Sequence, residues 1–90
     1  MEINKGDVVV SLAGRDKGKY FFVLTSGDIF VTIVDGKIRK LSAPKVKKCK
    51  HVGFISNAES RVREKILNSE RLEDAELRKA LRLYDVDSAV

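Results

Sequence analysis

The residues best suited to binding chemistry form one glycine-bounded segment, Gly14-Arg15-Asp16-Lys17-Gly18-Lys19. Glycine adopts backbone angles that a side chain forbids, so Gly14 and Gly18 predict a tight loop that presents the charged residues beside them. Exposed amides and cations on such a loop suit phosphate oxygens. The segment therefore indicates recognition of an anion. The alternative is that the glycines serve turn geometry alone and the charges are simply solvated.

A second basic region follows, and it contains no acid. Between Asp35 and Glu59 the chain holds seven lysines and arginines but no aspartate or glutamate. A surface that is merely solvated usually mixes both signs of charge, so this bias indicates a polyanionic partner. Lysines also protect edge strands from aggregation, which is an alternative role compatible with the first.

The composition points to the same class of partner. Lys and Arg total 18 against 13 Asp and Glu, which gives a net charge of +5 and an isoelectric point near 9.5 in a chain of 90 residues. Residues 1–51 carry eleven of these cations and only five acids, so the positive charge belongs to the first half. Nucleic acid is the first candidate ligand. A hydrophobic content of 43% is too high for a disordered chain.

Catalytic and metal chemistry find little support in the residues. The single cysteine, Cys49, excludes an intrachain disulfide, and together with His51 it supplies only two of the four ligands of a usual zinc site. The acids are scattered through turns, and there is no phosphate-cradling P-loop and no Ser/His/Asp order. We expect a non-enzymatic protein without metal or cofactor. The N-terminus lacks the features of a signal peptide and no apolar run could span a membrane, so we expect a cytoplasmic protein.

The first half of the chain reads as short strands divided by turns. Residues 8–12 alternate in polarity and predict one apolar strand face, whereas residues 19–25 are apolar on both sides and predict a strand covered on both faces. Alternation resumes over residues 29–33, and the Asp-Gly pair at 35–36 predicts a tight hairpin with residues 37–41 as the returning strand. Residues 45–52 look extended, with a bulge or bend. This pattern predicts a mainly β fold, with a small SH3-like barrel as the candidate.

The second half changes to a helical period. Ser56-Asn57-Ala58-Glu59 fits a capping box ahead of a short helix that carries Val62, Ile66 and Leu67 on one side, and residues 68–70 end that helix. Acids at residues 73–76 begin a second amphipathic helix. Its apolar stripe consists of Leu77, Ala80, Leu81 and Tyr84. We therefore expect residues 1–55 to form the barrel and residues 56–90 a helical extension packed on it, as a single compact domain.

The segment from Gly6 to Lys19 resembles the KOW motif, in which Gly-Asp opens a strand and a lysine-bearing, glycine-bounded turn leads into the next strand. The match covers residues 5–34, about a third of the chain. Within it, Val9-Val10-Ser11-Leu12-Ala13-Gly14 and the following loop look like a large-subunit ribosomal protein family of archaea and eukaryotes. The whole chain, with its short helical tail, is similar to small bacterial KOW-domain RNA-binding proteins. The resemblance implies an SH3-like barrel that binds structured RNA, with residues 14–19 as the motif loop.

The sequence therefore leads to the hypothesis of a module that binds structured, ribosomal RNA and is associated with the ribosome or translation. Its cations would meet phosphates, and RNA shape would supply most of the selectivity. The candidate RNA-binding residues are Gly14, Arg15, Asp16, Lys17, Gly18, Lys19, Lys37, Arg39, Lys40, Lys45, Lys47, Lys48, Lys50 and His51.

Three questions stay open at the level of sequence. Four aromatic residues, Tyr20, Phe21, Phe22 and Phe30, could stack on bases, but a barrel of this size needs most of them in its core, so we expect at least three there. The alternative function is a protein-interaction module. In that case the stripe of the second helix or an exposed strand would dock a ribosomal protein or RNA polymerase. The oligomeric state is left undetermined.

Overall fold

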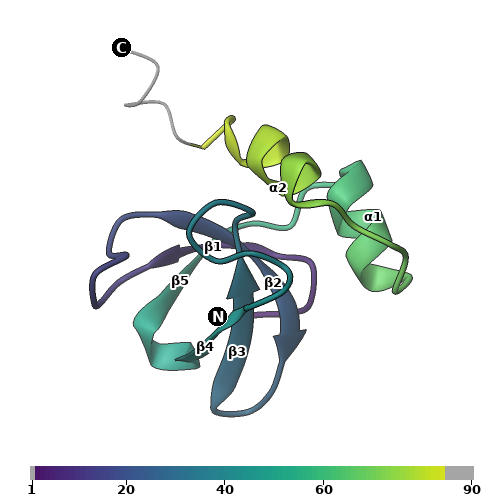
Figure 1. Ribbon diagram of the computed structural model, residues 1–90. Coiled ribbons are helices and arrows are strands. Elements are labelled where there is room, and N and C mark those ends of the chain that lie inside the picture. Colours follow the sequence, from purple (N-terminus) through teal and green to yellow (C-terminus); the bar gives the residue numbers. More distant parts are fainter. Residues whose placement is uncertain (1, 85–90) are drawn as a thin grey trace.

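Strand β2 (Tyr20–Ser26) lies at the centre of a five-stranded antiparallel sheet, and two short helices follow the sheet in the chain (Figure 1). The computed structural model describes residues 2–84. The strands lie in the order β4-β3-β2-β1-β5. The other elements are β1 (Val8–Ser11), β3 (Phe30–Val34), β4 (Lys45–Lys48), the 3₁₀ turn η1 (Cys49–His51), β5 (Val52–Ser56), α1 (Arg61–Leu67) and α2 (Asp74–Leu81). The prediction of a strand-rich first half followed by two helices is confirmed.

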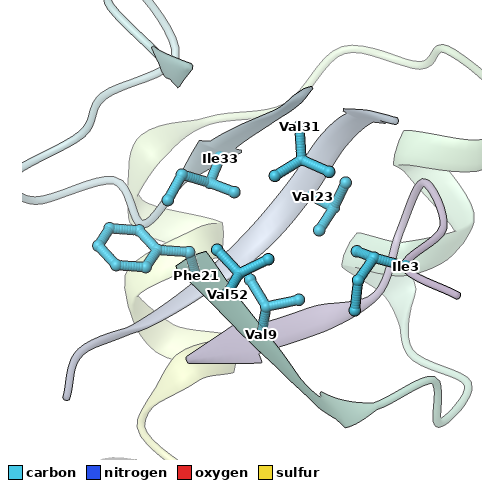
Figure 2. Close-up of a cluster of buried hydrophobic side chains, with 7 residues drawn as sticks. All are labelled: Ile3, Val9, Phe21, Val23, Val31, Ile33 and Val52. Carbon is cyan, nitrogen blue, oxygen red and sulfur yellow. The ribbon is translucent and has the colours of Figure 1, made fainter. Parts of the chain in front are cut away.

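Each face of the sheet has its own apolar cluster, which explains why β2 is apolar on both sides. Phe21 and Val23 of β2 point into the first cluster, shown in Figure 2. Phe22 points the other way, into a second cluster that the helices complete. The first cluster contains Ile3, Val9, Phe21, Val23, Val31, Ile33 and Val52, and the second contains Val8, Phe22, Val34, Val62, Ile66, Leu77 and Leu81. The double coverage predicted for this strand is confirmed.

Strand β1 has the same two-sided burial, and the single apolar face predicted for residues 8–12 is wrong. Val8 packs in the second cluster and Val9 in the first, while Leu12 lies beyond the strand and is about half exposed. The reason is the position of β1 between β2 and β5, with covering residues on both sides of the sheet. The alternating pattern of apolar and polar residues therefore predicted less burial for this strand than the structure has.

The predicted returning strand at residues 37–41 is also wrong. These residues form a loop, and the strand that pairs with β3 is β4, in the predicted extended segment. Asp35 closes the loop, because its Oδ1 accepts hydrogen bonds from the amides of Lys37 (2.9 Å) and Arg39 (2.8 Å). Its own amide and that of Gly36 both donate to the Arg39 carbonyl oxygen, at 2.9 and 3.1 Å. The Asp-Gly pair thus makes a local turn, and no two-residue hairpin forms there.

The bend predicted within residues 45–52 is present as η1, which separates β4 from β5. These two strands are the outer strands of the sheet, and only three residues join them. Cys49 packs against the first apolar cluster at this turn, as a small packed residue. The sheet therefore curves enough to bring the end of one outer strand to the start of the other.

Helix α1 begins later than the sequence pattern predicted. The N-cap is Ser60, whose Oγ accepts a hydrogen bond from the Arg63 amide at 3.1 Å, and residues 56–59 do not cap the helix. A capping box instead lies at Glu73 and Glu76, at the start of α2. Leu67 is exposed, contrary to its predicted place on the buried side. No helix among residues 2–84 is long and apolar enough to cross a membrane.

The helices are tied to the sheet by polar contacts as well as by the second cluster. The guanidinium of Arg63 in α1 donates to the buried carboxylate of Asp7, just before β1, at 3.2 Å. Lys65 of α1 donates to Glu76 of α2 at 2.5 Å, and this hydrogen bond lowers the pKa of Glu76. Both helices therefore lie in fixed positions on one side of the sheet (Figure 1).

Candidate nucleic-acid interface

The glycine-bounded segment forms the loop between β1 and β2, and its backbone is closed on itself. The Gly18 amide donates to the Ser11 carbonyl oxygen at 2.8 Å, and the Ser11 amide donates to the Lys19 carbonyl oxygen at 2.9 Å. Gly14 and Gly18 have φ angles of 83° and 86°, in the left-handed region that favours glycine. Both glycines are exposed. The loop is thus an ordered turn on the surface.

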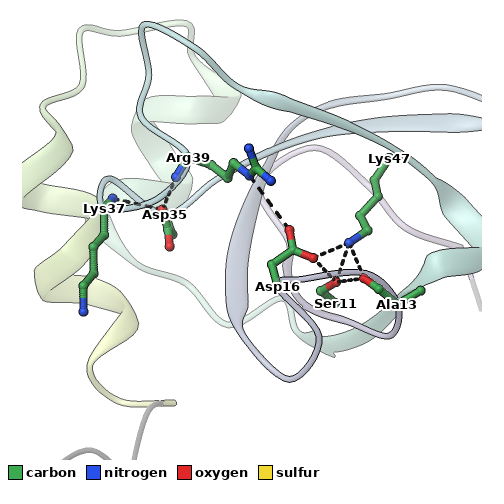
Figure 3. Close-up of polar contacts among 7 residues, drawn as sticks. All are labelled: Ser11, Ala13, Asp16, Asp35, Lys37, Arg39 and Lys47. Carbon is green, nitrogen blue, oxygen red and sulfur yellow. Dashed lines mark hydrogen bonds and ion pairs between the residues drawn. The ribbon is translucent and has the colours of Figure 1, made fainter.

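A buried lysine holds this loop against the sheet. Lys47 of β4 has a side chain only 9% exposed, and its ammonium donates to Ser11 Oγ (2.6 Å), to the Ala13 carbonyl oxygen (2.7 Å) and to Asp16 Oδ1, as Figure 3 shows. An ammonium has three hydrogens, so all its donors are used. Ser11 Oγ also donates to Asp16 Oδ1 at 2.8 Å. Lys47 therefore acts inside the protein, with its ammonium turned away from any ligand on the surface.

Asp16 is the acceptor at the centre of this network. Burial by itself raises the pKa of the Asp16 carboxyl, but hydrogen bonds from Lys47 and Ser11 and the charge of Lys47 outweigh that effect and hold the pKa below its usual value. Arg39 Nε lies 3.9 Å from Asp16 Oδ2, too far for a hydrogen bond, so this pair interacts through charge alone. Asp16 therefore remains ionised and positions the loop instead of contacting a ligand.

Three basic segments that are distant in the sequence meet around Asp16. The β1–β2 loop supplies Asp16 itself, the β3–β4 loop supplies Arg39, and β4 supplies Lys47 (Figure 3). The amide of Leu12 also donates to the His51 carbonyl oxygen at 2.8 Å, which places η1 beside the same loop. Arg15, Lys17 and Lys19 project from the loop as exposed side chains. Residues of the β1–β2 loop, the β3–β4 loop and β4 thus meet around Asp16.

Not all of the predicted cations face the same way. In the β3–β4 register, Lys47 lies opposite the buried Val31, whereas Lys48 lies opposite the exposed Phe30. Lys45 shares the face of Lys47 and is half-buried, because side chains two residues apart in a strand point the same way. Lys48 therefore lies on the opposite face of β4. Lys37, Lys40 and Lys50 are exposed on the β3–β4 loop and at η1, while Arg39 and His51 are partly buried.

The structure adds two cations that the sequence reasoning missed. Arg78 and Arg82 of α2 and its C-cap line a pocket together with Lys19 and Lys37. Arg78 Nη1 donates to the Gly36 carbonyl oxygen at 2.6 Å, which fixes the helix against the β3–β4 loop. One feature of the sequence could have indicated them, because arginines four residues apart lie on the same face of a helix. The acidic balance of the second half obscured it.

The aromatic residues divide between core and surface. Phe21 and Phe22 are buried, and Tyr20 is half-buried, packs against the second cluster and lies 5.9 Å from Tyr84 between ring centroids. Of the three aromatic residues expected in the core, Phe21 and Phe22 are buried there, and Tyr20 lies at its margin and is only partly buried. Phe30 is 50% exposed on the outer side of β3. It is the aromatic ring among these four that a ligand can reach most fully.

Comparison with models of known protein families gives no match, and comparison with curated protein sequences gives none either.

Proposed function

We propose that this protein binds structured RNA through the exposed cations of the β1–β2 loop and the β3–β4 loop, in association with the ribosome or translation. The observation that carries the proposal is the convergence of three basic segments, the β1–β2 loop, the β3–β4 loop and β4, around the buried Asp16. A preformed cationic loop loses little conformational entropy on binding, and exposed lysines and arginines contact phosphates irrespective of sequence. The ligand is then recognised by the path of its backbone, as expected for A-form RNA.

The proposed interface is narrower than the full set of sequence candidates. It consists of the exposed cations Arg15, Lys17, Lys19, Lys37 and Lys40, with Arg39 at its centre. Asp16 and Lys47 support it from inside, and Gly14 and Gly18 give the loop its shape. Lys48 and Lys50 extend the positive field around β4 and η1 without being required for the first contacts.

We also propose that the sheet curls into the SH3-like barrel that the sequence pattern favours. Two observations support it. The outer strands β4 and β5 are joined by only three residues, and the first apolar cluster draws side chains from β1, β2, β3 and β5 together with Ile3. A small core surrounded by strands in this way is typical of barrels that limit exposed edges. The barrel would give the binding loops a rigid base.

The test is a salt titration of binding to ribosomal RNA fragments. Each neutralised phosphate contributes a slope of about 0.7–0.9 in the logarithm of the binding constant against the logarithm of salt concentration. Contacts from the five exposed cations predict a slope of about −4. Affinity that does not respond to salt would contradict the mechanism.

Matched variants test whether the cations of the β1–β2 loop are the ones that contact RNA. Replacing Arg15 and Lys17 by glutamine removes two exposed loop cations and is expected to reduce the slope by about 1.5. The control replaces the exposed Arg61 and Lys79 of the helices by glutamine, with the same loss of charge away from the loops. An equal loss of RNA affinity in both variants would show attraction by net charge alone and would refute the proposed interface.

Of the two surfaces considered for protein interaction, the stripe of the second helix and an exposed strand, only the exposed strand is accessible. Leu77 and Leu81 of the α2 stripe are buried in the second cluster, so this stripe packs on the sheet and does not form a docking surface for a protein. The exposed apolar residues Ile29, Phe30 and Val46 at β3 and β4 form the surface that favours this second function. Capture of a ribosomal protein or RNA polymerase that survives nuclease treatment, and that is lost in Val46→Ser, would favour this docking function over RNA binding.

A further inference from the structure

A pocket of about 380 Å³ opens where three parts of the chain meet. Lys19 comes from the end of the β1–β2 loop, Lys37 and Ile38 come from the β3–β4 loop, and Arg78 and Arg82 come from α2 and its C-cap. Its volume lies in the range of about 300–1,000 Å³ that is usual for small-molecule sites. The pocket adjoins the proposed RNA interface, because Lys19 and Lys37 belong to both.

The charge of this pocket is strongly positive. Four of its lining residues are cations, and none of these four forms a salt bridge with an acid among residues 2–84. Its one acid, Asp35, is buried, and its Oδ1 already accepts two backbone amides. Four cations around one carboxylate leave an excess of positive charge and of hydrogen-bond donors, which favours a phosphate group.

One arginine is held in position for such a ligand. The hydrogen bond of 2.6 Å from Arg78 Nη1 to the Gly36 carbonyl oxygen uses one of the five N–H donors of the guanidinium. The remaining donors form a planar fork that suits two oxygens of one phosphate. Gly36 lies close against the start of α2, because a Cβ built on it would be 2.2 Å from the Asp74 carbonyl oxygen. The loop and α2 therefore fix the guanidinium at the pocket wall.

The same pocket also has apolar walls. Tyr20, Ile38 and Leu81 line it beside the cations. Tyr20 is half-buried, and its ring is supported by Tyr84 at 5.9 Å, while Ile38 is 47% exposed. A rigid aromatic ring and an exposed aliphatic side chain next to phosphate-binding groups match the two halves of a nucleotide, whose base is flat and apolar on its faces.

We propose that this pocket binds one nucleotide unit, with its phosphate on Arg78, Arg82, Lys19 and Lys37 and its base against Tyr20 and Ile38. The proposal rests on the proposed function, which makes an RNA strand the source of that nucleotide. The strand then leaves the loop surface at Lys19 and continues along α2. In this arrangement the helical tail contributes directly to RNA recognition.

The first experiment uses the pocket by itself. Uridine monophosphate is titrated into the ¹⁵N-labelled full chain, with uridine as the uncharged control. The amide resonances of residues 19, 37 and 38 and the Arg78 Nε resonance are expected to shift, and uridine is expected to bind at least about tenfold more weakly because it lacks the phosphate. Shifts confined to the region of Lys48, or equal shifts with uridine, would overturn the pocket as a nucleotide site.

The second experiment measures RNA binding by matched variants. Arg82→Gln removes a pocket cation that lies outside the proposed loop interface and leaves the Arg78 contact to Gly36 in place, and it is expected to weaken binding of the ribosomal RNA fragments at least about tenfold. The control, Lys79→Gln, removes one exposed cation of α2 outside the pocket and is expected to bind as wild type. Circular dichroism of each variant confirms that the fold is kept.

The outcomes separate the two proposals. Wild-type RNA affinity in the pocket variant overturns the pocket inference and leaves the RNA-binding function standing. Absence of RNA binding by the wild-type chain overturns the proposed function. If uridine monophosphate alone still binds in that case, the source is a free nucleotide and the RNA-strand form of the inference is wrong.

Discussion

Lys47→Met tests whether Lys47, the most buried of the cations predicted to bind RNA, stabilises the fold or contacts the ligand. Methionine keeps the apolar length of the side chain but removes the ammonium from three acceptors, among them the 3% exposed Asp16. Removing one partner of a buried ion pair costs about 3–5 kcal/mol. Ser11 still donates to Asp16 in the variant, and the charge of Arg39 is still near. We therefore expect the free energy of unfolding to fall by about 3 kcal/mol, at the lower end of this range.

The assay is urea unfolding followed by circular dichroism. With a denaturant dependence of about 1 kcal/mol per molar urea, a loss of about 3 kcal/mol lowers the unfolding midpoint by about 3 M. The matched control is Lys48→Met, one position along β4, where the side chain is exposed and the change in stability should stay within about 0.5 kcal/mol. Adding Asp16→Asn to Lys47→Met removes the orphaned charge and should recover about half of the loss.

The pH dependence of stability gives an independent check that the loss in Lys47→Met comes from the ion pair with Asp16. The folded-state pKa of Asp16 lies below its ordinary value of 3.8, so the pair stabilises the fold above that value, and this contribution is lost as the pH falls through the lowered folded pKa. The difference between wild type and Lys47→Met should therefore shrink below pH 4. A loss under about 1 kcal/mol, or one that is the same at pH 3 and pH 7, would refute the assignment of Lys47 to the interior.

Three further changes test other contacts. Gly36→Ala should cost at least about 2 kcal/mol more than Gly18→Ala in urea unfolding, because both glycines have positive φ but only at Gly36 would the Cβ clash with Asp74; equal costs would contradict the close approach of α2. Ser60→Ala should lose about 1 kcal/mol through removal of the N-cap, and an unchanged thermal midpoint would argue against that cap. Phe30→Ala should leave the fold and the affinity for ribosomal RNA fragments unchanged, because its exposed ring lies outside the proposed cationic interface, and a loss of about 1–3 kcal/mol of RNA-binding free energy would show that the ring stacks on a base.

Much of the architecture could be predicted because it depends on local pattern. The apolar run of residues 19–25 predicts a strand covered on both faces, since no other arrangement hides both rows of side chains, and the structure confirms it. The acids at the start of α2 predict its N-terminus for an equally local reason, their interaction with the free amides of the first turn. The glycines at 14 and 18 likewise predict a turn from their own conformational preference.

The errors arose where a distant part of the chain decided the local structure. The Asp-Gly pair favours a hairpin in isolation, but the loop that follows it is bound to α2. Asp74 Oδ1 at the start of α2 accepts a hydrogen bond from the Leu41 amide at 2.8 Å. That contact joins residues 33 positions apart, and no local pattern contains it. The burial of β1 on both faces depends in the same way on helices that come fifty residues later.

The amino-acid sequence by itself determined which side chains carry charge, where glycine allows a turn and which strand is apolar throughout, because these are properties of single residues and their neighbours. Only the tertiary structure decided what each cation does. It turned Lys47 inward to an internal carboxylate, left Arg15 and Lys17 on the surface, and brought Arg78 beside Lys19 and Lys37. The physical reason is that a charge acts according to its burial and its neighbours in space, and folding sets both through contacts between distant segments.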